Sequence, residues 1–315
     1  MMKKYLMGVD GGGTKTDVLL CTPEGQIVAR ACGGPSSVSG QSPEKAMEEL
    51  KNAIGSAFSM AGIDRNDVEG YYAGISGAGL QKNRDMYLAF FADFMPGVKG
   101  DAASDAANAL SSGIAMQNGA IAIAGTGSSI QYRVDGVLTR IGGWGYMLGD
   151  EGSGFDLGHR ALICAMRSVD ERIGDTLLRT LCEEKMGQHP NDWAPWLYRQ
   201  DTKTEIAAYA PILLQAAEQG DAVALEQLDE AARDMACAIQ TAVRRSGSVR
   251  VVMGGSLWKN ALYRETVKRH TGEGVEFIRA KCPPVCGAAV IAGHLVGCND
   301  TDELLQIIAE QYTKE

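Results

Sequence analysis

The sequence predicts an α/β protein built from two similar lobes, and three observations support this prediction. The chain has 315 residues, which corresponds to about two domains at about 150 residues each. Segments with strand patterns alternate with segments that place apolar residues at helical spacing. The order strand, glycine-rich turn, strand, turn, strand occurs twice, because a shift of 114 residues places Asp10–Thr14 over Ala124–Ser128. Two such lobes facing each other would form a cleft between the two glycine turns.

The composition excludes several classes of protein. The 30 Lys and Arg residues against 39 Asp and Glu give a net charge of −9, so the chain lacks the basic face that nucleic acids and anionic membranes require. No window of 18 apolar residues occurs, and the eight cysteines form neither a CxxC pair nor a Cys/His cluster typical of zinc. We therefore expect a cytoplasmic protein with free, mostly buried thiols and without a signal peptide, a membrane span or a nucleic-acid partner.

The first lobe is predicted to begin with three short strands. YLMGVD and TDVLLC flank a glycine-rich turn, and Thr22–Gly25 forms the next turn. A helix then starts at Pro43 and places Leu50, Ile54 and Ala57 on one face. In order, the expected elements are strands at 5–10, 16–21 and 26–32, a helix at 43–61, a strand at 68–75, a helix at 83–95, a strand at 98–101 and a helix at 106–114.

The second lobe repeats the opening pattern and then becomes mostly helical. GAIAIA and SIQYRV flank a GTGS turn, and Asp135-Gly136 leads into the next strand. In order, the expected elements are strands at 119–124, 129–134 and 137–141, helices at 155–169, 171–186, 202–219 and 222–245, a strand at 249–253, a helix at 260–270, a strand at 275–279, and helices at 284–296 and 301–313. Thr301 is the expected cap of the last helix.

The two glycine turns are candidate phosphate sites. GVDGGGTKT at 8–16 ends a strand in Asp10 and then exposes several backbone N–H groups, which suits phosphate oxygens. AIAGTGSSI at 122–130 is the same arrangement in the second half. The first matches neither a P-loop nor a dinucleotide-binding fingerprint, and each alone is also compatible with an ordinary hairpin turn. Asp10 is suitably placed to hold Mg²⁺ through water.

Three further motifs contain residues that could take part in catalysis or in ligand binding. Asp105, in ASDAANAL, is either a helix N-cap or a general base for an attacking hydroxyl. GGWGYMLGDEGSG at 142–154 offers an aromatic face and acidic acceptors typical of a sugar site, or a loop followed by a helix that Ser153 caps. VVMGGSLWKN at 251–260 is a strand-to-helix turn at which backbone can approach a nucleotide, or a turn of purely structural function.

Together these motifs resemble the N-acetylglucosamine kinase branch of the BadF/BadG/BcrA/BcrD ATPase family, which belongs to the superfamily of sugar kinases, heat-shock chaperones and actin. The resemblance extends from Gly8 to the helix at 287–295 and rests on GGGT, ISGAG at 75–79, SDAAN, GTGS, GGWG with GDEGS, and MGGSLWK. It implies two ribonuclease H-like lobes, at 1–116 and 117–296, with a nucleotide and sugar cleft between them. It also implies that a C-terminal helix at 297–315 packs back on the first lobe.

The resemblance further implies roles for individual residues. Asp105 would be the catalytic base that activates the sugar 6-hydroxyl, and Asp10 would hold Mg²⁺ through water. The residues implied in binding ATP are Asp10, Gly11, Gly12, Gly13, Thr14, Lys15, Gly125, Thr126, Gly127, Gly254, Gly255, Ser256 and Asn260. The residues implied in binding the sugar are Ser37, Ser76, Asp105, Ser128, Trp144, Gly145 and Asp150. Related kinases commonly have Asn where Ser37 stands, which leaves the identity of the sugar open.

The function implied by the resemblance is ATP-dependent phosphorylation of the 6-hydroxyl of an amino sugar, first of all N-acetylglucosamine, by a homodimer. Glucosamine and N-acetylmuramic acid are the alternative sugars. A second interpretation is an activator ATPase of an acyl-CoA reductase or dehydratase, but such proteins share a [4Fe–4S] cluster through cysteines in glycine-rich segments, and only Cys32 and Cys286 come near this pattern. A third is a non-catalytic sugar-sensing regulator, which would normally carry a DNA-binding helix-turn-helix.

Overall fold

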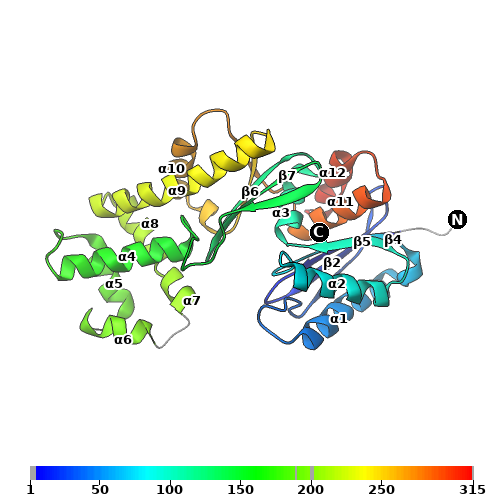
Figure 1. Cartoon of the computed structure of the whole chain (residues 1–315), viewed down its shortest axis with the longest axis horizontal. Helices are drawn as coiled ribbons and strands as arrows, with labels where there is room; N and C mark the ends of the chain where they lie inside the picture. Colours follow the sequence, from blue (N-terminus) through cyan, green and yellow to red (C-terminus); the bar gives the residue numbers. More distant parts are fainter. Residues whose placement is uncertain (1–4, 189, 199–201, 314–315) are drawn as a thin grey trace. The chain divides into compact units, whose positions relative to one another are not determined.

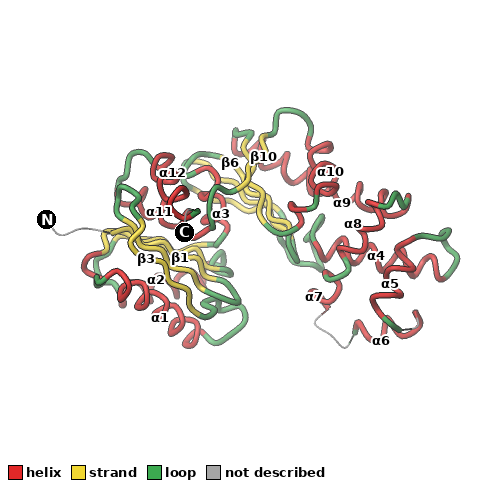
Figure 2. The backbone as a smooth tube through the Cα atoms, turned by 180° about the vertical axis from the view of Figure 1, so that it is seen from behind, coloured by secondary structure: helices red, strands yellow, loops and turns green. Residues whose placement is uncertain are grey.

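The computed structural model describes residues 5–188, 190–198 and 202–313 of the chain. It divides into two compact units, each with its own five-stranded sheet (Figures 1 and 2). The first unit combines the chain up to Asn118 with the segment from Ile278 onward, and the second unit is Gly119–Phe277. The outermost residues of the predicted lobes, 1–4 and 314–315, lie outside the described residues.

The first unit is a mixed sheet with helices on both faces. Its elements are β1 (Tyr5–Gly11), β2 (Thr16–Cys21), β3 (Ile27–Gly33), α1 (Pro43–Ala61), β4 (Val68–Ile75), α2 (Gln81–Phe94), β5 (Lys99–Ala103), α3 (Ala106–Ile114), α11 (Pro284–Val296) and α12 (Thr301–Tyr312). The strand order is β3-β2-β1-β4-β5, with β1 antiparallel to β2 and parallel to β4. Figure 1 shows α1 and α2 on one side of this sheet and α11 and α12 on the other.

The second unit repeats this sheet and adds a helical region. Its elements are β6 (Gly119–Ala124), β7 (Ser128–Val134), β8 (Val137–Ile141), α4 (Gly154–Val169), α5 (Leu177–Met186), α6 (Trp193–Leu197), α7 (Thr202–Ala207), α8 (Ala210–Glu218), α9 (Ala222–Ser246), β9 (Arg250–Gly254), α10 (Ala261–Thr271) and β10 (Glu276–Arg279). The strand order is β10-β9-β6-β7-β8. Read from the other edge, as β8-β7-β6-β9-β10, it corresponds to the order β3-β2-β1-β4-β5 of the first sheet, so the repeat predicted from the sequence is confirmed.

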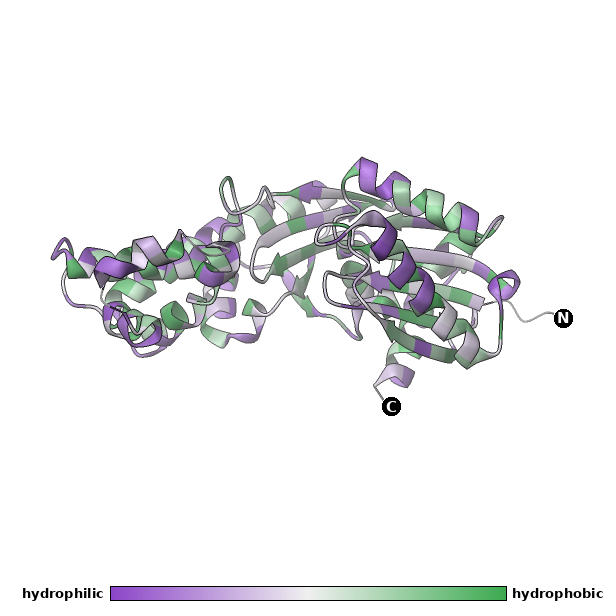
Figure 3. Cartoon of the chain, turned by 90° about the horizontal axis from the view of Figure 1, so that it is seen from below, coloured by the Kyte–Doolittle hydropathy of each residue, from purple (hydrophilic) through white to green (hydrophobic). Residues whose placement is uncertain are grey.

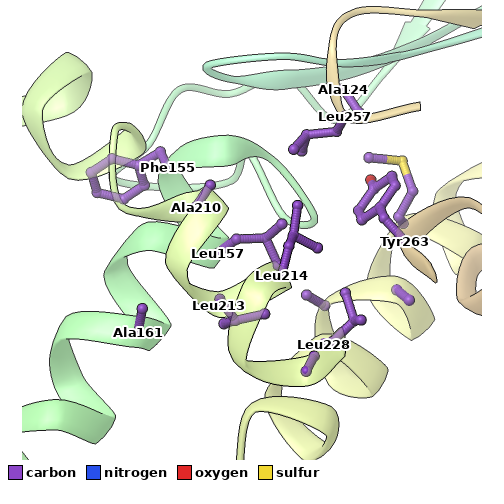
Figure 4. Packing of buried hydrophobic residues seen from close by; sticks show 14 of the residues in the cluster. Ala124, Phe155, Leu157, Ala161, Ala210, Leu213, Leu214, Leu228, Leu257 and Tyr263 are labelled. Atoms are coloured by element: carbon purple, nitrogen blue, oxygen red, sulfur yellow. The ribbon is translucent and has the colours of Figure 1, made fainter. Parts of the chain in front are cut away.

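Each unit has a separate apolar core. In the first, Leu50 and Ile54 of α1 pack with Met7 and Val9 of β1. In the second, α4, α8 and α9 pack on one another and α9 packs on β6 and β7, and Figure 4 shows Leu157, Leu214 and Leu228 among the packed side chains. The helices in Figure 3 alternate between purple and green, as helices with one buried and one exposed face do.

The helix α11 belongs to the first unit and not, as predicted, to the second. The sequence analysis assigned residues 284–296 to the second lobe, but α11 packs on β1, β4 and α3 of the first unit. Gly8 in β1 permits this approach, because a Cβ there would lie 2.6 Å from the Val285 carbonyl oxygen. The helix is apolar on nearly all sides, with buried residues from Val285 to Gly293, so its sequence does not indicate which sheet covers it.

Three predicted helix limits also change. The helix predicted at 202–219 is two helices, α7 and α8, because Pro211 cannot donate a helical hydrogen bond and stands in the first turn of α8. The helix predicted at 171–186 begins only at Leu177, where the Thr176 side chain accepts from Leu178 N. Asp300, not Thr301, caps α12 by accepting from Glu303 N.

Two predictions from composition can be compared with the structure. All eight cysteines are free, and five of them are buried. Within the residues that the structure describes, none of the helices has the length and apolar character needed to span a bilayer.

Candidate functional site

The first glycine turn is a tight hairpin between β1 and β2. Gly12 N donates to Lys15 O at 2.9 Å, which closes the turn, and Gly13 and Thr14 are exposed at its tip. Lys15 extends to Asp17, with 2.6 Å between Nζ and Oδ2. The exposed tip therefore presents backbone that is accessible to a ligand, while the Lys15 ammonium is paired with an acid of the same hairpin.

The segment 33–40 packs directly against this turn. The backbone N–H groups of Ser36 and Ser37 both donate to Gly12 O at 3.2 Å. Thr16 Oγ1 donates to Gly34 O at 2.7 Å and contacts Ser36 Oγ at 2.8 Å. A side chain at Gly11 would overlap the Ser36 hydroxyl, so this position needs glycine for space.

Ser37 joins a third segment to the same place. Its hydroxyl donates to Ser76 O at 2.8 Å, and Ser76 N donates to Gly11 O at 2.8 Å. Ser37 is only 2% exposed. The sequence analysis expected Ser37 to contact the sugar; in the structure its hydroxyl proton is engaged by the Ser76 carbonyl, so Ser37 holds the turn that contains Ser76.

Asp10 lies at the end of β1 with its carboxylate largely buried. Asn108 of α3 donates to Asp10 Oδ1 at 2.8 Å. Burial raises the pKa of Asp10 to about 6, the hydrogen bond from Asn108 opposes this, and the negative charges of Asp105 and Asp17 raise the pKa further. Asn108 was not among the predicted site residues; the only signal in the sequence was an amide side chain within a helix of small residues.

Asp105 stands at the head of α3 and does not cap it. Its backbone is helical rather than extended, and its carboxylate makes no capping hydrogen bond, so the N-cap interpretation is wrong. Ser104 Oγ donates to Asp105 Oδ1 at 3.2 Å. Burial raises the pKa of Asp105 above its ordinary value, which moves the carboxylate toward the basicity that a general base near neutral pH requires.

The carboxylate of Asp10 suits a cation such as Mg²⁺ that takes its remaining ligands from water and substrate phosphates. Among the described residues there is no group of three or more His, Cys, Asp or Glu side chains that would enclose a metal. The carboxylates of Asp105 and Asp17 repel the charge of Asp10, Lys15 attracts it, and Asp10 accepts a hydrogen bond from the neutral amide of Asn108. Mg²⁺ commonly uses one or two carboxylates together with water and substrate phosphates, and Asp10 suits such a site.

In the second unit, the GTGS turn and the GDEGSG loop form one packed structure. Gly125 N donates to Gly127 O at 3.0 Å, which closes the turn. The first N–H groups of α4 donate to this turn, from Gly154 to Gly125 O at 2.7 Å and from Phe155 to Thr126 O at 3.0 Å. Ser128 Oγ donates to Glu151 O at 2.8 Å. The turn is thereby seated on the N-terminus of α4, whose N-cap is Ser153 as predicted.

Asp150 lies against the same turn. It is 3% exposed and has a positive φ of 63°, an unusual conformation that Asp tolerates better than most residues. Its Oδ2 lies 2.8 Å from Lys203 Nζ, and a Cβ on Gly127 would lie 2.6 Å from that oxygen. Lys203 follows much later in the chain, and no local pattern indicated that it would reach the turn.

Trp144 and Gly145 lie in an exposed loop. Trp144 is 65% exposed, and the Arg140 guanidinium lies 4.6 Å from the centre of its ring. Gly145 has a φ of 85°, which favours glycine. The aromatic face predicted for the sugar is therefore accessible, with one side near a cationic group.

The third glycine segment packs against the end of β6. Gly255 has a φ of 95°, and a side chain there would overlap the Ala124 carbonyl. Trp258 Nε1 donates to Ala122 O at 2.8 Å, which fixes the segment after Ser256. Asn260 caps α10 through Tyr263 N at 2.9 Å, and its amide donates to Glu218 at 2.8 Å. Both ends of the Asn260 side chain thus have structural partners.

The predicted site residues thus gather in two groups, one in each unit. Asp10, the turn after it, Ser37, Ser76 and Asp105 lie in the first unit, around the ends of β1 and β4. The GTGS turn, Asp150 and the segment after β9 lie in the second, around the end of β6. Both groups occupy equivalent ends of equivalent strands.

Comparison with known proteins identifies relatives over most of the chain. The sequence model of the BadF/BadG/BcrA/BcrD ATPase family matches residues 7–292. An N-acetylmuramic acid/N-acetylglucosamine kinase of Clostridium acetobutylicum is 32% identical, over 76% of this chain and 79% of its own. An N-acetyl-D-glucosamine kinase of Dictyostelium discoideum is 27% identical, over 93% and 98% respectively. The crystal structure of a proposed N-acetylglucosamine kinase from Chromobacterium violaceum is 28% identical, with a TM-score of 0.73 over 93% of this chain and 100% of its own.

Proposed function

The chain belongs to the BadF/BadG/BcrA/BcrD ATPase family, and from this premise we propose that it is a kinase that transfers the γ-phosphoryl group of ATP to the 6-hydroxyl of an amino sugar. N-acetylglucosamine is the first candidate, because both curated relatives and the solved structure described above have names that include it. N-acetylmuramic acid is the second, because the Clostridium relative is named for both sugars.

The observation that supports this proposal most directly is the state of Asp105. A carboxylate that makes no capping bond at a helix head, with a pKa raised by burial, is suited to accept a proton from a substrate hydroxyl. Phosphoryl transfer needs little more from protein groups than such a base, a cradle for phosphate oxygens and neutralisation of charge. The two glycine turns, at equivalent strand ends, are candidates for the cradle.

In the proposed mechanism, Asp105 holds and deprotonates the sugar hydroxyl, while exposed backbone of the Gly13–Thr14 tip and the GTGS turn binds phosphate oxygens. Asp10 would hold Mg²⁺ through water. When bound with the nucleotide, that ion would neutralise charge on the transferred phosphoryl group. Ser76 and Asp150 would contact the sugar, with Ser37 and Lys203 holding them in place.

The direct test is a coupled ADP-release assay over N-acetylglucosamine, N-acetylmuramic acid and glucosamine with ATP and Mg²⁺. We expect ADP release that depends on one of these sugars, and a product whose phosphate is attached to the 6-carbon by ³¹P–¹H correlation spectroscopy. Excess chelator should abolish turnover, and added Mg²⁺ or Mn²⁺ should restore it. ATP hydrolysis at a rate that no amino sugar changes would contradict the proposal and favour an activator ATPase.

A further inference from the structure

We propose that Asn108 is a positioning residue, which holds the Asp10 carboxylate at a fixed place relative to α3, the helix headed by Asp105. This inference rests on the function proposed above and adds to it a residue that does not contact the substrate. Asn108 lies one helical turn after Asp105 and is fully buried, so it acts through the residues around it and not on the sugar or the nucleotide.

The carboxamide nitrogen of Asn108 faces three acceptors. It lies 2.8 Å from Asp10 Oδ1, 3.0 Å from Val9 O and 3.2 Å from Gly74 O. Because all three are acceptors, the nitrogen and not the oxygen of the amide must face them. One side chain of α3 thereby ties together the ends of β1 and β4 and the carboxylate that extends from β1.

The surrounding backbone makes room for this side chain. A Cβ at Gly74 of β4 would overlap the Asn108 carboxamide, and a Cβ at Gly287 of α11 would overlap the Asn108 carbonyl. Neither glycine has a positive φ, so space and not backbone conformation explains them. Gly74 thus leaves the volume that the Asn108 side chain fills, and Gly287 lets α11 approach the backbone of α3 at Asn108.

The chemistry of the donor favours a functional over a purely structural role. A neutral amide orients a carboxylate without cancelling its charge, whereas Lys or Arg would neutralise Asp10 and compete with a cation. The carboxamide oxygen is buried and has no hydrogen-bond partner among the described residues. A residue retained only for structural stability would be expected to satisfy both ends of its side chain.

The test compares three variants. Asn108→Ala removes the donor and leaves a space. Asn108→Ala with Gly74→Ala returns a methyl group to that space without returning the donor. Asn108→Asp keeps the shape, loses the donor and places a second negative charge beside Asp10. Ser112→Ala is the matched control, because this buried hydroxyl of α3 donates within the helix to Ala109 O at 2.8 Å.

We expect all three Asn108 variants to lower kcat by about 10²-fold, the effect typical of a small misplacement of catalytic groups, with the KM for the sugar within about threefold of wild type. In the two variants that carry Asn108→Ala, binding of Mg²⁺ with a non-hydrolysable ATP analogue, measured by calorimetry, should weaken by about 2- to 13-fold, as expected for one lost hydrogen bond. The added methyl group should recover part of the thermal stability but none of the kcat. The control should change stability without changing kcat.

Two results would overturn the proposal: a kcat that recovers in the Gly74→Ala double variant, since Asn108 would then only fill space, or wild-type kcat and nucleotide binding in any folded Asn108 variant. These outcomes are distinct from a failure of the proposed function. If the wild-type protein phosphorylates none of the sugars, the kinase proposal fails, and the calorimetric comparison of Asn108 variants with wild type still decides the role of Asn108. Unchanged nucleotide binding would then overturn it.

Discussion

At the scale of single residues, the first unit buries two carboxylates, although their charged forms are stabilised better by water than by the protein interior. Asp10 and Asp105 are both largely buried, and the charge of Asp105 contributes to the raised pKa of Asp10. Burial of carboxylates costs stability, and acids whose pKa is raised by burial are typical of functional sites. Both positions therefore lead to predictions that separate activity from stability.

Asp105→Asn should abolish most turnover while ATP binding is retained. The amide keeps the shape of the carboxylate but cannot accept the sugar proton, and a general base contributes about 10²–10⁴-fold to turnover. Steady-state kinetics and calorimetry with ATP would measure the two effects. A variant that keeps more than about half of the wild-type kcat would remove Asp105 from the mechanism.

Asp10→Asn should stabilise the ligand-free protein above pH 6. The pKa of Asp10 is about 6 in the folded protein and 3.8 as the ordinary value, so the folded state binds more protons between these values and loses stability as the pH rises through them. Removal of the charge should raise Tm at pH 8 and change it little below about pH 4. Asp93→Asn, at an exposed site on α2, is the control, and a pH-independent difference in Tm would contradict the assignment.

Ser37→Ala should weaken sugar binding through Ser76. The substitution removes the hydrogen bond to the Ser76 carbonyl, which is worth about 0.5–1.5 kcal/mol, so the KM for the sugar should rise by about 2- to 13-fold while kcat changes little. The same series of sugars would show whether their ranking changes. The control is Ser56→Ala, on the exposed face of α1. If the Ser37→Ala variant and the wild-type protein had the same KM for every sugar tested, this loop would not support the pocket.

At the scale of elements, glycines allow close packing of helices at specific points. Gly158 of α4 faces the end of α7, where a Cβ would overlap the Ile206 carbonyl. Gly55 of α1 has no such neighbour, because a Cβ there would meet nothing within 4 Å. The same residue type thus has opposite roles in two helices, which the sequence alone does not distinguish.

Gly158→Ala should therefore destabilise the protein, and Gly55→Ala should stabilise it. Forcing a methyl group into a packed contact typically costs about 1–3 kcal/mol, whereas replacing an unconstrained glycine in a helix by alanine gains up to about 1 kcal/mol. Chemical denaturation would measure both changes in the free energy of unfolding. If Gly158→Ala did not lower the free energy of unfolding, the close contact between α4 and α7 would not exist in solution.

At the scale of the whole molecule, the two units differ in how the chain builds them. The second unit is one continuous segment, whereas the first requires α11 and α12 from the far end of the sequence. The helix α11 covers β1 and β4 and makes contacts with α3, so one face of the first sheet stays uncovered until the last part of the chain is present. The cores of the units are also separate sets of residues.

A chain that ends at Arg279, the last residue of β10, should consequently keep a folded second unit and lose the first. Limited proteolysis with mass spectrometry should find protection within 119–277 and cleavage throughout 5–118. A chain that ends at Val296, which lacks only α12, is the control and should retain more of the first unit. Loss of protection in both units on truncation at Arg279 would show that the second unit does not fold independently.

Much of this architecture could be predicted from local sequence. The strands around both glycine turns, the repeat of the two sheets and most helices follow from periodicity and turn residues, which are properties of short segments. The break at Pro211 and the Asp300 cap are also local signals, although the sequence analysis placed both differently. The glycine motifs predicted the tight turns after β1 and β6, because the conformational freedom of glycine is a local property of the chain.

The partners of the candidate site residues were decided only by the tertiary structure. Asn108 reaches Asp10, Lys203 reaches Asp150, and Ser37 holds Ser76, in each case across a separation that no periodicity spans. The placement of α11 on the first sheet belongs to the same class, because a helix that is apolar on nearly all sides fits several sheets equally well. Local patterns determine which elements form, whereas packing between distant segments determines which side chains meet, and the charge and pKa of a site residue depend on that meeting.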